Sequence, residues 1–341
     1  MYHVGMQKLI NKIVCGDCIE ILSKVRKPFA DLIFADPPFN IGYQYDHYQD
    51  KLKKDKYIAW TRDWMAVCKK VLKPHGSFYI AIGDEYAANV RLIADELGLV
   101  MRNWIIWHYT FGQQMKNKFA RAHTHILYFV KDKAKFTFND DVGRVLSDRQ
   151  KKYNDKRANP DGKLPDDVWN EFPRVCGTFE ERTGWHPCQM PESILARIIH
   201  VSSKPGEVVL DPFSGSGTTC VVAYKLKREF AGIEISPKYV EETIKRIQAS
   251  EVGAIEGDGE VTWNTHFDSE LKWLYHENKI TTEQLEDNDN LLKLFTLKFS
   301  QRIGQTCTPK EIKRRLRQLR KSGKLGPLVR GRATTTSKLF E

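Results

Sequence analysis

Two short motifs, each directly after an apolar run, constrain this chain most strongly. Asp36-Pro37-Pro38-Phe39 follows the apolar residues 30–35, and the run DPFSGSGTT at 211–219 follows the apolar residues 208–210. In open α/β sheets, ligands bind just past the carboxyl ends of the strands. The two motifs therefore predict a pair of binding loops at one edge of such a sheet.

Hydrophobic patterning around the motifs predicts alternating strands and helices. The expected strands are 12–14, 30–35, 78–82, 104–107, 126–130, 207–211 and 230–234. The expected helices are 18–24, 57–72, 84–97, 191–203, 216–227 and 237–249. Such alternation favours an α/β fold, with a doubly wound, mostly parallel, Rossmann-like sheet.

Breaks in this pattern divide the chain into regions. We expect one half of the sheet domain at 1–138, an insertion outside the sheet at 139–183, the other half at 184–250, a linker at 251–260 and a basic helical module at 261–341. Helices are expected at 267–278, 289–302 and 309–322, the last beginning with Thr308 as N-cap and Pro309. Residues 40–56 lack periodicity and predict a loop that could act as a lid.

Positive charge is concentrated in two zones of the 341-residue chain. The formal net charge is +11, residues 301–341 carry +10, and residues 116–157 carry +7. Two basic zones on a nearly neutral body favour a polyanionic partner, and we interpret it as nucleic acid. The residues expected to contact it are Lys116, Lys118, Arg121, Lys151, Lys152, Arg314, Arg315 and Arg317.

The seven cysteines are scattered and odd in number, which favours reduced thiols in a cytoplasmic protein. Cys15 and Cys18 have C-x-x-C spacing, but no second ligand pair follows at a usable distance, so no metal site is predicted. The sequence shows neither an apolar run long enough to span a membrane nor a signal peptide.

The downstream motif has the features of a nucleoside pocket. Glycines at 215 and 217 would let backbone approach a ligand, and Glu234 lies 23 residues after Asp211, a spacing typical of a carboxylate that binds ribose hydroxyls. No lysine follows Gly217, so this is not a phosphate loop of the Walker type. The pattern favours a neutral or cationic nucleoside such as S-adenosylmethionine.

The upstream motif is suited to an amino group whose lone pair is delocalised into a base. The Asp36 carboxylate and the Pro37 carbonyl could accept both N–H bonds of the amine and so free that lone pair. The two prolines hold these acceptors in place before the substrate binds. Phe39 offers a flat face for a base drawn out of a duplex.

Together these residues resemble the DNA amino-methyltransferases that act on adenine N6 or cytosine N4. The motif order, circularly permuted with the amine motif first, is similar to that of the beta class. The resemblance assigns catalysis to Asp36, Pro37, Pro38 and Phe39. It assigns cofactor binding to Asp17, Cys18, His186, Pro187, Gln189, Asp211, Phe213, Ser214, Gly215, Ser216, Gly217, Thr218, Thr219 and Glu234.

The resemblance implies transfer of methyl from S-adenosylmethionine to adenine N6 in double-stranded DNA, without a metal. It implies that residues 139–183 recognise the target sequence. From the resemblance we also expect a bacterial, archaeal or phage-encoded protein that could form a homodimer and could be paired with a cognate restriction endonuclease. Cytosine N4 methylation is the nearest alternative. A DNA-binding regulator that keeps the methyltransferase core as a scaffold is an alternative of another class.

Overall fold

The structure is a computed structural model that describes residues 8–326, except 47, 49, 114, 154, 160, 178–180, 251–262, 304 and 306. The expected linker at 251–260 and the end of the basic module, 327–341, lie outside the described residues. In the described part, no helix has both the length and the apolar character needed to cross a membrane.

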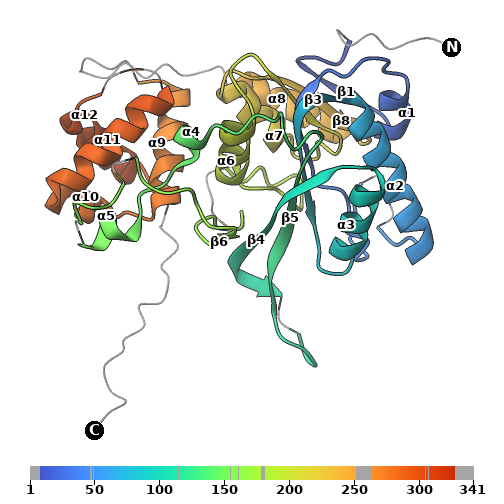
Figure 1. The fold of residues 1–341 in the computed structure, drawn as a ribbon, viewed down its shortest axis with the longest axis horizontal. Coiled ribbons are helices and arrows are strands. Elements are labelled where there is room, and N and C mark those ends of the chain that lie inside the picture. The colour runs from blue at the N-terminus through green and yellow to red at the C-terminus, as the bar shows by residue number, and fades with distance from the viewer. Residues whose placement is uncertain are drawn as a thin grey trace.

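An eight-stranded sheet with the order β1-β8-β7-β2-β3-β5-β4-β6 forms the centre of the molecule (Figure 1). Its strands are β1 Lys12–Cys15, β2 Ala30–Ala35, β3 Leu72–Ile82, β4 Val100–Gln113, β5 Arg121–Val130, β6 Val168–Trp169, β7 Val208–Asp211 and β8 Glu229–Glu234. Every neighbouring pair is parallel except the two that involve β5. The predicted doubly wound, mostly parallel sheet is confirmed.

Helices cover both faces of this sheet. The first face carries α1 Cys18–Ser23, α2 Lys54–Val71 and α3 Ala87–Glu96, and the second carries α6 Glu192–Ser202, α7 Thr218–Lys225 and α8 Pro237–Ala249. Successive strand residues alternate between the two cores: Ile33 packs with the first set of helices, and Leu32 and Phe34 with the second. This alternation follows from the two-residue period of a strand.

Residues 139–183 differ from the expected insertion outside the sheet. Their strand β6 extends the sheet by pairing in parallel with β4, with Trp107 opposite Trp169. The same region contains two short helices that the patterning missed, α4 Asp140–Gly143 and α5 Asp148–Tyr153. Trp169 is buried in the core of the second face, so an apolar pair inside a polar stretch was enough to build an edge strand.

The C-terminal helices form a module with its own core, at the left of Figure 1. They are α9 Thr265–Asn278, α10 Thr282–Asp287, α11 Asp289–Ile303 and α12 Pro309–Lys321, of which α10 was not predicted. Leu146, from the preceding region, is fully buried in this core, and its N–H donates to Asn278 Oδ1 over 2.8 Å. The module is therefore packed onto the rest of the chain.

Helix α6 lies between the sheet and this module, and all of its residues are buried. On the module side, His200 Nε2 lies 2.8 Å from Glu270 Oε1, and Arg197 forms ion pairs with Glu171 and Glu277. The guanidinium of Arg197 also lies 4.4 Å from the ring centre of Phe172. A buried charged network thus joins the two parts of the molecule.

Candidate active site

Four adjacent strands end at one cavity of about 310 Å³. Asp36 follows β2, Asp211 ends β7, Glu234 ends β8, and Asp17 follows β1 after a one-residue turn. Because β1, β8, β7 and β2 run parallel, their carboxyl ends meet at the same edge of the sheet. Both motifs therefore line one site, and every predicted catalytic and cofactor residue except Gly217 borders the cavity.

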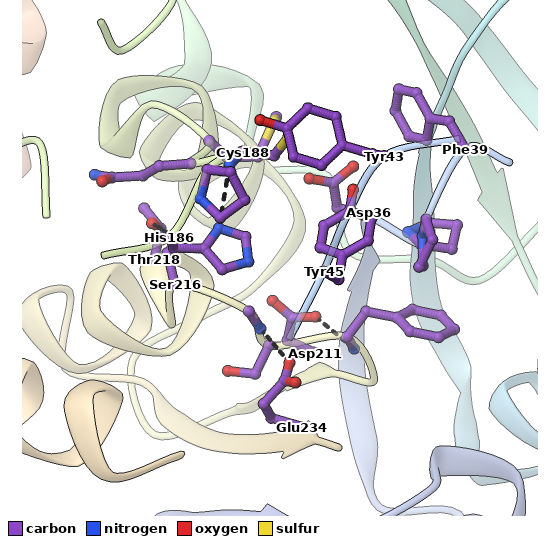
Figure 2. A pocket seen from close by; sticks show the side chains of 18 of the residues that line it. Asp36, Phe39, Tyr43, Tyr45, His186, Cys188, Asp211, Ser216, Thr218 and Glu234 are labelled. Atoms are coloured by element: carbon purple, nitrogen blue, oxygen red, sulfur yellow. Dashed lines mark hydrogen bonds between the residues drawn. The ribbon is translucent and has the colours of Figure 1, made fainter. Parts of the chain in front are cut away.

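The upstream motif is held from both sides. Tyr57, a buried residue of α2, donates its hydroxyl to the Pro38 carbonyl over 2.6 Å. On the other side, a β-carbon added at Gly83 would lie 3.3 Å from the Phe39 ring. The motif is thus anchored at its third residue and packed at its fourth, which orients Asp36 toward the cavity (Figure 2).

The segment after the motif is folded around the buried carboxylate of Asp50. That carboxylate accepts backbone N–H bonds from Asn40, Ile41 and Tyr43 at 2.6, 3.0 and 3.1 Å. The Asn40 amide in turn bonds both backbone groups of Leu52. One carboxylate therefore gives a polar, aperiodic sequence a defined loop, and Tyr43 and Tyr45 from this loop border the cavity.

Aromatic rings from several elements form one wall of the site. The rings of Tyr45 and His186 have centres 6.5 Å apart, those of Tyr48 and Trp60 stack at 5.9 Å, and Trp60 lies 5.7 Å from Phe213. Figure 2 shows Tyr43, Tyr45 and His186 with Asp36 at the same cavity. Rings of this kind can pack a nucleoside or face a cation.

The downstream motif is organised by Glu234. One oxygen of this carboxylate accepts the Gly215 N–H at 2.8 Å and the other accepts the Ser236 N–H at 2.9 Å. Each oxygen has a second lone pair, so the carboxylate can still accept bonds from a ligand's hydroxyls. At the start of the loop, Asp211 accepts the Phe213 N–H at 3.0 Å.

Both glycines also meet packing requirements within the chain. A β-carbon at Gly215 would come within 2.9 Å of His186 Nε2, so this glycine lets the His186 ring pack on the loop. Gly217 does not border the cavity and has φ of +73°, and a β-carbon there would lie 2.2 Å from Thr243 Cγ2. The structure therefore gives Gly217 a packing role between α7 and α8, and its assignment to cofactor contact stays a prediction.

Other predicted cofactor residues border the cavity but also hold the local structure. Asp17 caps α1 by accepting the N–H bonds of Ile19 and Glu20 at 2.8 and 3.0 Å. Gln189 links two segments through the Glu181 carbonyl and the Thr183 N–H. Burial lowers the pKa of His186 to about 4, so this ring is neutral near pH 7.

The cavity carries carboxyl groups without cationic side-chain partners. Burial, with Asp211 nearby, raises the pKa of Asp36 to about 8. Burial also raises the pKa of Asp211 to about 7, and Glu234 adds to that increase. The pKa of Glu234 is raised by burial as well. No lysine or arginine of the described chain forms an ion pair with these three groups.

This donor set fits S-adenosylmethionine. A positively charged ligand would lower the pKa values of Asp36 and Asp211 and so relieve the cost of their burial. The aromatic wall provides faces for the adenine and for the cationic centre. Glu234, Asp17 and the loop at 214–216 would hold the nucleoside, and the segment at 186–189 borders the same cavity.

The residues predicted to bind DNA do not form one surface. Arg121 borders the cavity and pairs with Asp84 at 2.8 Å, while Lys116 and Lys118 are exposed between β4 and β5. Lys151 and Lys152 lie on α5, where both pair with Asp148.

The basic helix α12 is largely neutralised within the module, so the prediction of Arg315 as a DNA contact was wrong. Arg315 is buried and donates from Nε and Nη2 to the two oxygens of Asp268, the first at 2.7 Å. Arg317 is exposed but pairs with Glu286 at 2.7 Å. The net charge in the sequence could not show that acidic partners on α9 and α10 face this helix.

Several residues that border the cavity were not assigned by sequence reasoning. They include Tyr43, Tyr45, Trp60, Arg174 and Tyr239. The three tyrosines near residue 45 were visible in the predicted lid, and their clustering was the available signal. Tyr239 and Arg174 gave none, because they reach the cavity only through the folding of α8 and of the region before α6.

The sequence of this chain matches a known protein family. The family model of N6/N4 methylases, described as DNA methylase, matches residues 30–246, more than half of the chain. The chain belongs to this family. It is 39% identical over 246 residues to DNA adenine methyltransferase YhdJ of Escherichia coli (strain K12), a match that covers 70% of this chain and 83% of the relative.

Other methylases are similar to this chain. Type II methyltransferase M.HpaI of Haemophilus parainfluenzae is 36% identical over 239 residues, covering 70% of this chain and 74% of the relative. Among solved structures, the cytosine-N4-specific PvuII DNA methyltransferase has a TM-score of 0.54 and 20% identity, covering 78% and 93% of the two chains. This methylase is an enzyme that uses S-adenosylmethionine to methylate DNA.

Proposed function

We propose that this methylase transfers a methyl group to the exocyclic N6 amine of adenine in double-stranded DNA, with Asp36 as the catalytic residue. The main support for this proposal is the position of Asp36. Its carboxyl group borders the cavity at the end of β2, beside the loop of the downstream motif, and no described side chain donates a hydrogen bond to it. The 39% identity to an adenine methyltransferase supports adenine as the base.

When bound, S-adenosylmethionine supplies an electrophilic methyl group. Asp36 would accept a hydrogen bond from one N–H of the base amine, which makes the nitrogen lone pair more available. As positive charge develops on that nitrogen, the carboxylate would stabilise it and finally take the released proton. The Pro37 carbonyl is the second acceptor in this proposal, and Pro38 is held by Tyr57.

Because the pKa of Asp36 is raised, this scheme requires that the Asp36 carboxyl group lose its proton before it accepts the hydrogen bond of the amine. In the free cavity burial favours the protonated acid near neutral pH, and that form is a poor acceptor. A cationic ligand in the same cavity favours the carboxylate. Binding of the methyl donor would therefore prepare the acceptor for the amine.

The order of the two motifs, the shared cavity and the family all support the enzyme over the scaffold-only regulator. Self-association and a paired restriction endonuclease stay predictions. The proposed recognition region, residues 139–183, also stays a prediction, although its strand β6 places it beside β4, which borders the cavity at Trp107 and Tyr109.

The test is incubation of the purified chain with methyl-labelled S-adenosylmethionine and mixed-sequence duplex DNA, followed by nucleoside mass spectrometry. N6-methyladenine is the expected product, and Asp36→Asn is the matched control for contaminating activity. N4-methylcytosine would keep the chemistry and overturn the base. DNA binding without any methylated base would favour the regulator. Sequencing of the methylated DNA then gives the recognition site.

A further inference from the structure

A fully exposed phenylalanine marks the tip of the β4–β5 hairpin. Phe119 is 99% exposed, the largest value among the exposed large apolar side chains of the described chain. The hairpin extends well beyond the body of the sheet, as Figure 1 shows at its lower edge. Exposed apolar side chains are common on protein surfaces, so the exposure of Phe119 becomes informative only with its place on this hairpin and the charges beside it.

The base of the same hairpin borders the active-site cavity. Trp107 and Tyr109 on β4 and His123 and Thr124 on β5 line it, and Trp107 pairs with Thr124 in the ladder. Phe119 is five residues from Thr124, which corresponds to roughly 15 Å at the rise of an extended chain. The hairpin is thus an arm that starts at the cavity and carries an aromatic ring at its end.

The tip has the charge expected of a segment that enters DNA. Lys116 and Lys118 are exposed on either side of Asn117, and no acidic residue occurs from 115 to 121. Arg121, at the start of β5, turns instead to Asp84 and the cavity. A two-stranded ribbon fits the major groove, whose depth of about 8.5 Å is less than the length of this arm.

We propose that Phe119 is a wedge that enters the base stack of duplex DNA next to the target base and holds the stack open while that base occupies the cavity. An apolar side chain between base steps is a known way to unstack and kink a duplex. Lys116 and Lys118 would position the tip on phosphates without reading sequence. This inference rests on the proposed function, because it requires a base to leave the helix.

The test compares two duplexes that carry the recognition site found by methylation sequencing. In one the target base is paired correctly, and in the other it faces a mismatch, which lowers the cost of extrusion. Phe119→Ala should lower kcat/KM on the paired duplex about ten-fold, in line with the loss of one ring–base stack. On the mismatched duplex the loss should be much smaller, and Phe119→Trp should restore turnover on both.

Two controls separate the wedge from general effects. Phe138→Ala removes a 40% exposed phenylalanine beyond the other end of β5 and should leave kcat/KM unchanged on both duplexes. Lys118→Ala should weaken binding to both duplexes equally and reduce the salt slope by about one. A fluorescent base analogue at the target position should show less unstacking with Phe119→Ala than with the wild-type chain.

Equal losses on the paired and mismatched duplexes would overturn the wedge, as would no loss on either. Both outcomes leave the methyltransferase assignment intact, because wild-type turnover is measured in the same assay. A wild-type chain that methylates no duplex would overturn the proposed function and this inference together.

Discussion

Buried or half-buried carboxylates occur in two regions of this methylase, and their surroundings differ. In the active-site cavity, Asp36, Asp211 and Glu234 have raised pKa values, with burial as the first cause in each case. Between α6 and the C-terminal module, the pKa of Glu270 is lowered, despite burial, by His200 and Arg302. In its described part, the chain provides cationic partners for the acid between α6 and the module but none for the acids of the cavity.

This difference distinguishes acids of the ligand-binding cavity from acids that hold two parts of the structure together. Glu277 has Arg197 on one side and Arg302 on the other, so its charge is matched within the chain. Asp36 has no such partner in the described structure, so the neutralising charge must come from a ligand or a proton. Buried acids that lack a cation are candidates for ligand contact, whereas matched ones hold the architecture together.

The sharpest way to break this comparison is Asp36→Ala. We expect methyl transfer to fall by at least about 10²–10³-fold, because the acceptor for the amine is lost, while S-adenosylmethionine still binds. Single-turnover assays and calorimetric titration of the cofactor measure the two effects. Asp63→Ala, at an exposed position on α2, is the control. Turnover that survives Asp36→Ala would remove its catalytic role.

Neutralising one acid in each region tests the two kinds of burial directly. Glu277→Gln should lower the free energy of unfolding by about 3 kcal/mol, because it leaves two buried arginines underbalanced. Asp211→Asn should leave the ligand-free chain as stable or more stable at pH 8, yet weaken cofactor binding. Urea unfolding of both variants gives the comparison, and equal destabilisation would show that the distinction has no energetic basis.

The pH dependence of stability should reveal the cavity acids. Burial raises the pKa of Asp36 from its ordinary value of 3.8 to about 8, so the proton that the folded state retains stabilises it, and this contribution is lost as pH rises toward and through 8. The melting temperature of the ligand-free chain should fall between pH 6 and 9, and Asp36→Asn should reduce that fall by about 2 °C or more. If the melting temperatures of the wild-type chain and of Asp36→Asn fall in parallel over this pH range, the raised pKa of Asp36 is contradicted.

The smallest expected effect concerns the basic C-terminus. Deleting residues 327–341 removes Arg330, Arg332 and Lys338 and should reduce the salt slope of DNA binding by about two to three. Arg317→Ala should change it less, because that arginine already pairs with Glu286. Filter-binding titrations at several salt concentrations measure both, and a larger effect from Arg317 would place α12 on the DNA.

Sequence patterning was sufficient where one element decides its own structure. Helix α8 was predicted at its observed bounds, since Ser236 and Pro237 mark its start and its apolar face is regular. The two motif loops were also found, because each follows a buried strand. The mostly parallel character of the sheet was also predicted, because strands alternate with helices, whereas the strand order was not.

Patterning failed where a distant partner decides the outcome. Gly217 faces Thr243 on α8, and Arg315 faces Asp268 on α9, contacts that exist only after folding. Strand β6 has two residues, too few to show a period, and is defined only by its pairing with β4. The loop after Phe39 depends on Asp50, whose importance comes from the three N–H groups that it collects.

The fully buried helix α6 has a consequence for any shortened form of this chain. The family match ends at residue 246, yet α6 carries His200, which pairs with Glu270, and Arg197, which pairs with Glu277 as well as with Glu171. Removal of the C-terminal module would take away the Glu277 partner of Arg197 and the Glu270 partner of His200, and it would expose residues of α6 that are now buried. We therefore expect that a chain cut back to the family match would be less stable than the whole chain.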